Sequence, residues 1–374
     1  MNNKLFDCAI IGGGLAGLTL AVQLADAGHA VILFEKNKYP FHKVCGEYIS
    51  MESYDFLERI GVPLSTMNLP MINEIKISSP NGNSFTRNLD LGAFGMSRYF
   101  MDDYLAKLAQ SKGVVLLEET KVFDVAFEHD EFEITTSQDV FKSKVACGAY
   151  GKKSSLDQKL ARKPVRTKKN YMAVKYHIQL NFPANRIELH NFKDGYCGIS
   201  KVEGDKYCLC YLSNAQNLKE NGNDIKAMEK NVLMKNVFLK KYFTEAVFLY
   251  KQPLTISQIT FSKKTAIENH VLMLGDAAGN ISPLCGNGMS MAMNASYIAF
   301  GFIDKYLKKV LTRQALEHFY ESEWNNIFSN RIKAGKYIQH LFGKETLTNV
   351  SIGLLKRTSL LTDKLISLTH GSKF

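Results

Sequence analysis

The sequence predicts an α/β fold: a βαβ unit forms a dinucleotide-binding domain, a mixed or antiparallel β-sheet is inserted as a second domain, and a helical segment follows at the C-terminus. Three observations lead to this prediction. An apolar run at 6–11 is followed directly by the motif Gly-x-Gly-x-x-Gly at 12–17 and a helical pattern. A second strand–turn–helix pattern begins at Val271. Between the two, polar and apolar residues alternate over 171–180 with the period of two that is typical of half-buried strands.

The glycine motif has the residue types that a pyrophosphate site requires. Gly12 allows a sharp turn, Gly14 allows the backbone to approach a phosphate, and Gly17 allows close packing of helix on strand. The N-terminus of the following helix presents unpaired N–H groups to the phosphates. A second apolar run, 30–34, ends at Glu35, which can accept hydrogen bonds from ribose hydroxyls. Strand, turn, helix and acid together predict a bound dinucleotide.

The second motif, Val271–Gly279, indicates a flavin rather than a nicotinamide nucleotide. It predicts a buried strand that ends at Gly275 and Asp276, followed by the segment 282–288 and a helix over 289–309. FAD is long and carries a hydroxylated ribityl chain, so Glu35 could hold one end while Asp276 accepts from the other. The turn 286–288 could aim N–H groups at the flavin edge that becomes negative on reduction.

These motifs resemble the FAD-dependent oxidoreductases of the p-hydroxybenzoate hydroxylase type, in the branch that contains geranylgeranyl reductases and related monooxygenases. The resemblance implies that Arg98 contacts the pyrophosphate or ribose region and that the strap, residues 43–47, passes beside the isoalloxazine ring with Cys45 near it. The matching segments are 12–17, Lys43–Glu47, Gly95–Tyr99 with Asp102, Cys147–Gly151, Gly275–Gly279 and Gly286–Gly288. The predicted FAD-binding residues are Gly12, Gly14, Leu15, Ala16, Gly17, Glu35, Lys36, Lys43, Cys45, Gly46, Arg98, Val122, Gly275, Asp276, Gly286, Asn287, Gly288 and Met289.

Two departures from the family limit what the resemblance implies. Geranylgeranyl reductases typically carry a Tyr-x-Trp-x-Phe-Pro stretch, and the nearest segment here, Gly195–Ser200, has neither the tryptophan nor the proline. This weakens an assignment to isoprenoid reduction. Flavin-dependent halogenases carry a motif with two tryptophans, whereas this chain has one, Trp324, which argues against halogenation.

The predicted domains are discontinuous in sequence. We expect the FAD-binding domain to comprise 1–72, 95–162 and 262–330. The substrate-binding sheet comprises 73–94 and 163–261, and 331–374 forms a basic helical segment. Such a sheet can form the far wall of a substrate cavity over the flavin.

Side chains of the inserted sheet are candidates for substrate contact. They are His177, Tyr196 and Tyr211, with His190 as a further candidate; burial in the core as hydrogen-bonded residues is the alternative for each. Cys45 could donate a proton in the reaction or simply pack, and Lys43 could lower its pKa. Glu47 in the same strap could bond to backbone N–H groups. Cys208 and Cys210 are expected in the core.

Composition narrows the possible partners. The seven cysteines are scattered without a Cys-x-x-Cys pair, which predicts neither a disulfide framework nor a metal site. The formal net charge is +11, but no nucleic-acid module accompanies it, so we expect no nucleic-acid partner. No apolar stretch is long enough to span a membrane, and we expect a cytoplasmic monomer.

The C-terminal segment combines basic charge with helical apolar periodicity. Apolar residues from Leu347 to Leu368 recur at spacings of three, four and seven, which predicts an amphipathic helix. Packing against the substrate domain is the default expectation. The alternative is reversible, peripheral contact with a membrane of anionic lipid.

Three functions remain open on the sequence. No second Gly-x-Gly-x-x-Gly unit is present, so NAD(P)H would dock transiently at the flavin, or another protein would supply electrons. The first hypothesis is an NAD(P)H-dependent monooxygenase that hydroxylates a hydrophobic small molecule, aromatic or polyketide- or lipid-like. The second is an ene-reductase that saturates C=C bonds of an isoprenoid or polyene, with Cys45 or a tyrosine as proton donor. The third is a flavin-binding scaffold without turnover.

Overall fold

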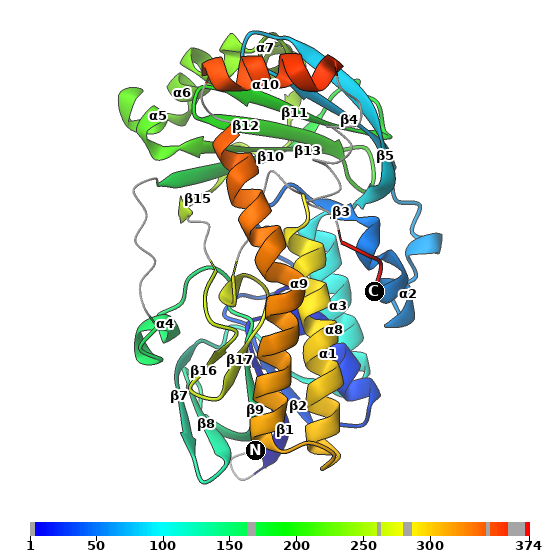
Figure 1. Cartoon of the computed structure of the whole chain (residues 1–374), viewed down its shortest axis with the longest axis vertical. Helices are drawn as coiled ribbons and strands as arrows, with labels where there is room; N and C mark the ends of the chain where they lie inside the picture. Colours follow the sequence, from blue (N-terminus) through cyan, green and yellow to red (C-terminus); the bar gives the residue numbers. More distant parts are fainter. Residues whose placement is uncertain (1–3, 163–169, 260–262, 280–285, 342–344, 358–370) are drawn as a thin grey trace.

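The computed structural model describes residues 4–162, 170–259, 263–279, 286–341, 345–357 and 371–374. Two β-sheets lie one above the other along the long axis of the molecule, and the long helix α9 (Arg313–Leu341) extends from the lower sheet towards the upper one (Figure 1). The expected mixed α/β architecture is therefore confirmed.

The lower sheet has eight strands and carries the predicted βαβ unit. Its path is β16-β17-β9-β1-β2-β6, and β8 joins β9 to β7. The pairs among β17, β9, β1, β2 and β6 are parallel. The strands are β1 (Leu5–Ile11), β2 (Val31–Phe34), β6 (Val115–Leu117), β7 (Val122–Glu128), β8 (Glu131–Thr136), β9 (Val140–Gly148), β16 (Ile267–Glu268) and β17 (Val271–Met273).

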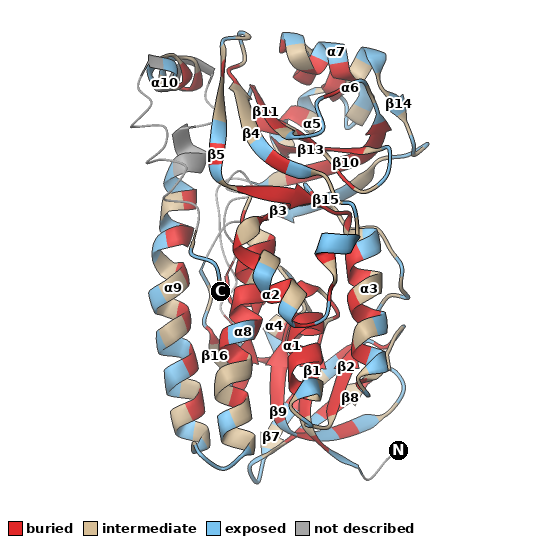
Figure 2. Cartoon of the chain, turned by 90° about the vertical axis from the view of Figure 1, so that its right-hand side faces the viewer, coloured by how far each residue is buried: buried red, intermediate tan, exposed pale blue. Residues whose placement is uncertain are grey.

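Helices cover one side of this sheet. The helix α1 (Leu15–Asp26) packs against α3 (Arg98–Ser111) and α8 (Gly288–Leu307), and α9 packs outside α8. Strand β1 and helix α1 are almost entirely buried, whereas α9 keeps an exposed side (Figure 2). Short apolar strands that are buried along most of their length are typical of parallel sheets.

The upper sheet has nine strands, in the order β14-β10-β13-β12-β11-β4-β5-β3, with β15 on β10. All of its pairs are antiparallel except β4 with β11. The strands are β3 (Tyr48–Ser50), β4 (Met71–Ser78), β5 (Ser84–Gly95), β10 (Tyr171–Gln179), β11 (Arg186–Phe192), β12 (Gly195–Lys201), β13 (Tyr207–Asn214), β14 (Val247–Phe248) and β15 (Leu254–Ile259). Besides the expected range 73–94, the sheet thus includes β3 and the first two residues of β4. The strand β3 was not predicted because a three-residue strand leaves no periodic signal.

The outer face of the upper sheet is covered by three short helices, α5 (Ala215–Glu220), α6 (Ile225–Asn231) and α7 (Val237–Glu245). They enclose a second core built on Tyr176, Leu209 and Tyr211. The inner face turns towards the lower sheet. The remaining elements are α2 (Tyr54–Arg59), α4 (Leu156–Lys159), α10 (Glu345–Arg357) and the 3₁₀ turns η1 (Met51–Ser53), η2 (Leu64–Thr66), η3 (Leu233–Lys235) and η4 (Gly275–Ala277).

The last described residues return to the lower part of the molecule. The Phe374 ring packs on Phe56 of α2 and Tyr297 of α8, with ring centroids 5.2 and 6.0 Å apart. Helix α10 confirms the start of the helix predicted after Leu347, whereas Leu361, Leu365 and Leu368 lie outside the described residues. Within the described part of the chain, no helix combines the length and apolar character needed to cross a bilayer.

Candidate functional site

One continuous cavity of about 1110 Å³ joins the two sheets. It begins at the glycine motif and Glu35 on the lower sheet, passes the strap, and ends against the inner face of the upper sheet. Among the predicted FAD-binding residues, all but Gly17 and Asn287 line this cavity. Gly17 instead packs beneath the turn, and Asn287 is fully buried at the start of α8.

The glycine turn leaves no room for side chains. Gly12 has φ +110°, and a Cβ atom there would lie 2.5 Å from the carbonyl oxygen of Ala149. A Cβ on Gly17 would lie 2.1 Å from the carbonyl oxygen of Gly12. Gly14 is the N-cap of α1 and provides no side-chain cap, so the first-turn N–H groups face the cavity end uncapped by a side chain. This is the arrangement that binds a phosphate at a helix N-terminus.

Glu35 is fixed at the carboxyl end of β2. Its Oε2 accepts a hydrogen bond from the Gly13 amide at 2.9 Å, and its Oε1 accepts from the Asn37 amide at 3.0 Å and from Asn37 Nδ2 at 2.8 Å. Each carboxylate oxygen can accept more than one hydrogen bond. The side chain therefore remains able to accept from a ribose placed in the cavity.

A buried cluster of opposite charges lies beside the glycine turn. Arg98 donates to both carboxylate oxygens of Asp102, at 2.7 and 2.8 Å, and Lys43 Nζ lies 2.8 Å from Asp102 Oδ2. Burial alone would raise the pKa of Asp102, but the charges of Arg98 and Lys43 outweigh it and hold that pKa below its ordinary value. Two cations facing one carboxylate leave a net positive charge, which suits a pyrophosphate.

The far wall is built where β17 passes into α8. Gly275 has φ +54°, and Asp276 next to it is partly exposed, with its Oδ2 4.0 Å from Lys152 Nζ. Gly286, Gly288 and Met289 line the same wall, while 280–285 lie outside the described residues. These features fit FAD: the helix start is uncapped, the glycine turn carries no side chains, and the cluster beside it is positive. Glu35 and Asp276 lie at opposite ends of the cavity, where they can hold the ribose and ribityl hydroxyls.

The strap crosses the middle of the cavity. Its Cys45 lines the cavity, and the Cys45 Sγ lies 3.6 Å from the Sδ of Met289 on α8. Glu47 ends the strap with a left-handed backbone, φ +56°, and its side chain turns into the protein interior. The strap therefore exposes a thiol on one side and buries a carboxylate on the other.

Behind the strap, Glu47 meets two side chains of β10. Lys175 Nζ and His177 Nε2 bond to different oxygens of the Glu47 carboxylate, His177 at 2.5 Å, and the Arg98 amide donates to Oε1 at 2.8 Å. Burial alone would raise the pKa of Glu47, but the hydrogen bond from His177 and the charge of Lys175 outweigh it, so that pKa lies below its ordinary value. The carboxylate stays ionised in a buried site.

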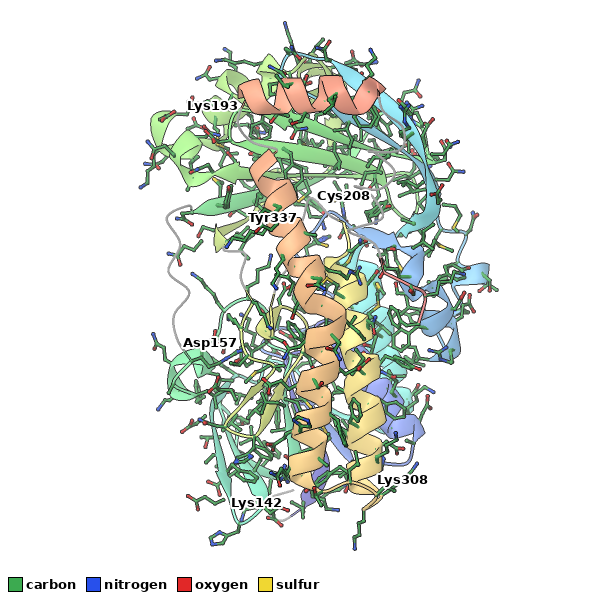
Figure 3. The ribbon with its side chains drawn as sticks, in the orientation of Figure 1. Lys142, Asp157, Lys193, Cys208, Lys308 and Tyr337 are labelled. Atoms are coloured by element: carbon green, nitrogen blue, oxygen red, sulfur yellow. The ribbon has the colours of Figure 1, made fainter. Side chains whose placement is uncertain are left out.

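Glu47, His177 and Cys208 have metal-ligand spacing, since one potential ligand atom of each lies within 4.8 Å of the others. Cys208 lies directly opposite His177 in the pairing of β13 with β10, and Figure 3 marks it on the upper sheet. However, its Sγ donates to the carbonyl oxygen of Cys45 at 3.2 Å, and the Lys175 ammonium already balances the Glu47 charge. These contacts favour a hydrogen-bonded cluster over a metal centre.

The candidate substrate residues separate into three positions. Tyr196 lines the cavity on its apolar face. His177 lies behind the strap. Tyr211 borders the cavity, but its hydroxyl donates to Glu229 of α6 at 3.0 Å, on the opposite face of the sheet, because odd-numbered residues of β13 point outward.

The prediction of a substrate role for His190 is wrong for the same reason. Its Nδ1 lies 2.7 Å from Ser78 Oγ and its Nε2 lies 2.9 Å from Glu188 Oε2, beneath α7. Serine, histidine and glutamate in this order could suggest a hydrolase triad, yet all three are buried and none lines the cavity. They form a structural cluster.

Three residues of the site were not identified from the sequence, namely His42, Lys175 and Tyr250. Tyr250 OH lies 2.5 Å from His177 Nδ1 and 3.2 Å from His42 Nδ1. Lys175 and His177 both belong to the polar phase of β10, so their shared face was readable from the alternation. The approach of the strap and of Tyr250 to that face was not.

The comparison with protein families decides the class of the protein. A family model described as "FAD binding domain" matches residues 6–323. The chain belongs to this FAD-binding family. Its members are typically oxidoreductases, as the motifs of the lower sheet led us to expect.

Individual relatives are distant. The chain is 26% identical to "Conditioned medium factor receptor 1" of Dictyostelium discoideum, over 86% of this chain and 68% of that protein. It is 22% identical to "Digeranylgeranylglycerophospholipid reductase 2" of Methanopyrus kandleri, over 91% of this chain and 87% of the relative. The solved structure of the flavin-dependent brominase Bmp2 superposes with a TM-score of 0.82 at 17% identity, covering 98% of this chain and 93% of that one. That likeness shows the fold alone.

Proposed function

We propose that this flavoprotein is an ene-reductase that saturates C=C bonds of an apolar, isoprenoid- or polyene-like molecule. The observation that carries the proposal is the position of Cys45, whose thiol side chain lines the cavity in the strap and contacts Met289 at the start of α8. Reduction of a C=C bond needs a proton donor beside the cofactor, and a thiol in this position can provide it. This position of Cys45 favours C=C reduction over hydroxylation, which was the first hypothesis drawn from the sequence.

The cavity wall supports an apolar substrate. On the upper sheet its apolar members include Ile75, Ile77, Leu89, Ile187, Leu189 and Leu212, and its polar members include Tyr196, Ser200 and Cys210 together with Thr255, Ser257 and Gln258 of β15. Among the described residues of this sheet that line the cavity, none carries a charge. A carboxylated aromatic substrate would lack a counter-ion there, whereas an alkyl or isoprenoid chain would bury its surface against these side chains.

The proposed step balances as the addition of a hydride and a proton. FAD, when bound and reduced, supplies the hydride to one carbon of the double bond. Cys45 gives its S–H proton to the neighbouring carbon, so one C–H bond forms as the S–H bond breaks, and the thiolate regains a proton from water. NAD(P)H is the proposed electron donor to the flavin, and it would dock transiently, since the sequence has no second dinucleotide motif.

A monooxygenase remains the second candidate, because the same apolar wall can exclude water from a reaction with oxygen. The relation to a digeranylgeranylglycerophospholipid reductase supports the first candidate, but at 22% identity it does not decide between the two.

The same experiment run without and with oxygen separates the two functions. Purified, FAD-loaded protein is mixed with a reduced nicotinamide or dithionite and a polyprenyl alcohol that has several double bonds, once anaerobically and once in air. The masses of the products are then measured by mass spectrometry. A gain of two hydrogens per reduced bond without oxygen supports the reductase. A gain of one oxygen atom, seen only in air, overturns it in favour of the monooxygenase.

A further inference from the structure

A chain of hydrogen bonds leads from the buried side of the strap towards the surface. It runs from Glu47 through His177 and Tyr250 to His42, with heavy-atom distances of 2.5, 2.5 and 3.2 Å. Glu47 and His177 are buried, whereas His42 and Tyr250 are half-buried. The His42 ring also stacks on Tyr99, which is exposed, with centroids 4.5 Å apart.

The direction of these hydrogen bonds is fixed from the buried end. An ionised Glu47 can only accept, so His177 donates its Nε2–H to it. The Nδ1 of neutral His177 must then accept, and it does so from the Tyr250 hydroxyl. That leaves the Tyr250 oxygen free to accept from a ring N–H of His42. Every member of the chain therefore donates towards Glu47.

We propose that His177 takes up a proton from solvent, through Tyr250 and His42, when the cofactor in the cavity is reduced. Reduction adds negative charge on one side of the strap, and a cation on the other side is then stabilised. With His177 neutral, Glu47 and Lys175 balance each other. With His177 protonated, the cluster carries one positive charge.

The transfer conserves protons. Water gives a proton to His42, His42 passes a ring proton to the Tyr250 oxygen, and the Tyr250 hydroxyl passes its own proton to His177 Nδ1. For each N–H or O–H bond that breaks, one forms, and the net change is one proton moved from solvent to His177. This proton uptake requires bound FAD but no substrate, so it is a property separate from the proposed reduction of C=C bonds.

The groups that face His177 come from four directions. They are Glu47 and His42 from the strap region, Lys175 from β10 itself, Cys208 from β13, and Tyr250 after β14, with the Arg98 amide behind Glu47. The Cys45 thiol lies on the other side of the strap, next to Met289. Lys206 and Glu203 lie further out, near His42 and Tyr250. Among the described residues, Tyr250 and His42 connect His177 to the half-buried edge by hydrogen bonds of 2.5 and 3.2 Å.

The first test counts protons at equilibrium. The midpoint potential of the FAD-loaded full chain is measured against pH without substrate, because its slope gives the protons taken up per two electrons. His177→Gln is expected to take up as much as about one proton fewer than the wild type when the cofactor is reduced. An unchanged slope would overturn uptake at His177.

The second test addresses the path and does not depend on the folding of the His177 variant. In Tyr250→Phe the hydroxyl is lost, and uptake during anaerobic reduction by dithionite, followed with an indicator dye, should slow roughly tenfold or more. Tyr242→Phe is the matched control, since its hydroxyl also bonds a buried glutamate–histidine pair, Glu188 and His190, but under α7. Equal rates in the two variants would overturn the path. Neither test contains a substrate, so both are independent of the outcome for reduction or hydroxylation.

Discussion

Lys175 and Glu47 form an ion pair in which both side chains are fully buried, although 128 positions separate them in the sequence. The pair ties the strap of the cofactor cavity to β10 of the upper sheet. We expect Glu47→Gln to destabilise the protein by about 3 to 5 kcal/mol, because it leaves the Lys175 charge buried without its partner. Thermal or urea denaturation measures the change.

The control for this prediction is a lysine–glutamate ion pair at the surface. Lys193 and Glu220 lie 3.2 Å apart, and both are more than 40% exposed. Lys193 is marked in Figure 3 on the outer side of the upper sheet. Lys193→Ala should leave the denaturation midpoint nearly unchanged, since water already solvates both charges. Equal effects of the two substitutions would contradict the structural role of Glu47.

The glycine motif gives a second prediction. Gly17→Ala should destabilise the protein by about 1 to 3 kcal/mol and lower its FAD content, because the new Cβ would collide with the Gly12 carbonyl. Gly301→Ala in α8 meets no atom within 4 Å and should be neutral or stabilising by up to about 1 kcal/mol. Denaturation and the ratio of flavin to protein absorbance check both.

Cys45 carries the third prediction. Cys45→Ala should lower anaerobic product formation about a hundredfold or more when the rate is expressed per bound FAD, because the proton donor is lost. Cys210→Ala is the comparison, since Cys210 also lines the cavity but from β13. If Cys45→Ala turns over at the wild-type rate, the thiol is not the donor.

The fourth prediction concerns the pH dependence of stability, to which the lowered pKa of Glu188 contributes. Burial alone would raise its pKa, but hydrogen bonds with His190 and Tyr242 outweigh it and lower the pKa to about 2. A carboxyl whose pKa is depressed in the folded state stabilises the fold above its unfolded pKa, and loses this contribution as the pH falls towards 2. The contribution is on the order of 3 kcal/mol at neutral pH. Acid unfolding of the wild type should therefore be steeper between pH 4.5 and 2 than that of Glu188→Gln.

Helix α10 leads to a fifth prediction. Val350 and Leu354 lie one turn apart and are 68% and 53% exposed, with the exposed Lys356 nearby. We propose that this face contacts anionic lipid reversibly. The protein should co-sediment with anionic vesicles at low salt and be released at high salt, and Val350→Ser with Leu354→Ser should weaken the binding. No sedimentation of the wild type at low salt would contradict the proposal.

Local pattern sufficed for the nucleotide end of the site. The residues of the glycine turn, Glu35 and Asp276 each follow a short buried strand, and their roles depend on backbone geometry a few residues long. The sequence motifs could therefore predict them, together with helix α8 and the strands β10 to β13. The strand β3 was missed, since three residues carry no period.

The sequence by itself determined the class of cofactor and the two sheets, because turns, caps and hydrophobic periods are properties of neighbouring residues. Only the tertiary structure decided which side chains of the upper sheet serve the cavity. His190 and the Tyr211 hydroxyl point to the outer core, while Lys175, His177 and Tyr250 gather behind the strap. The reason is physical: a buried carboxylate such as Glu47 must find its partners wherever the fold places them, and those partners lie far away in the chain.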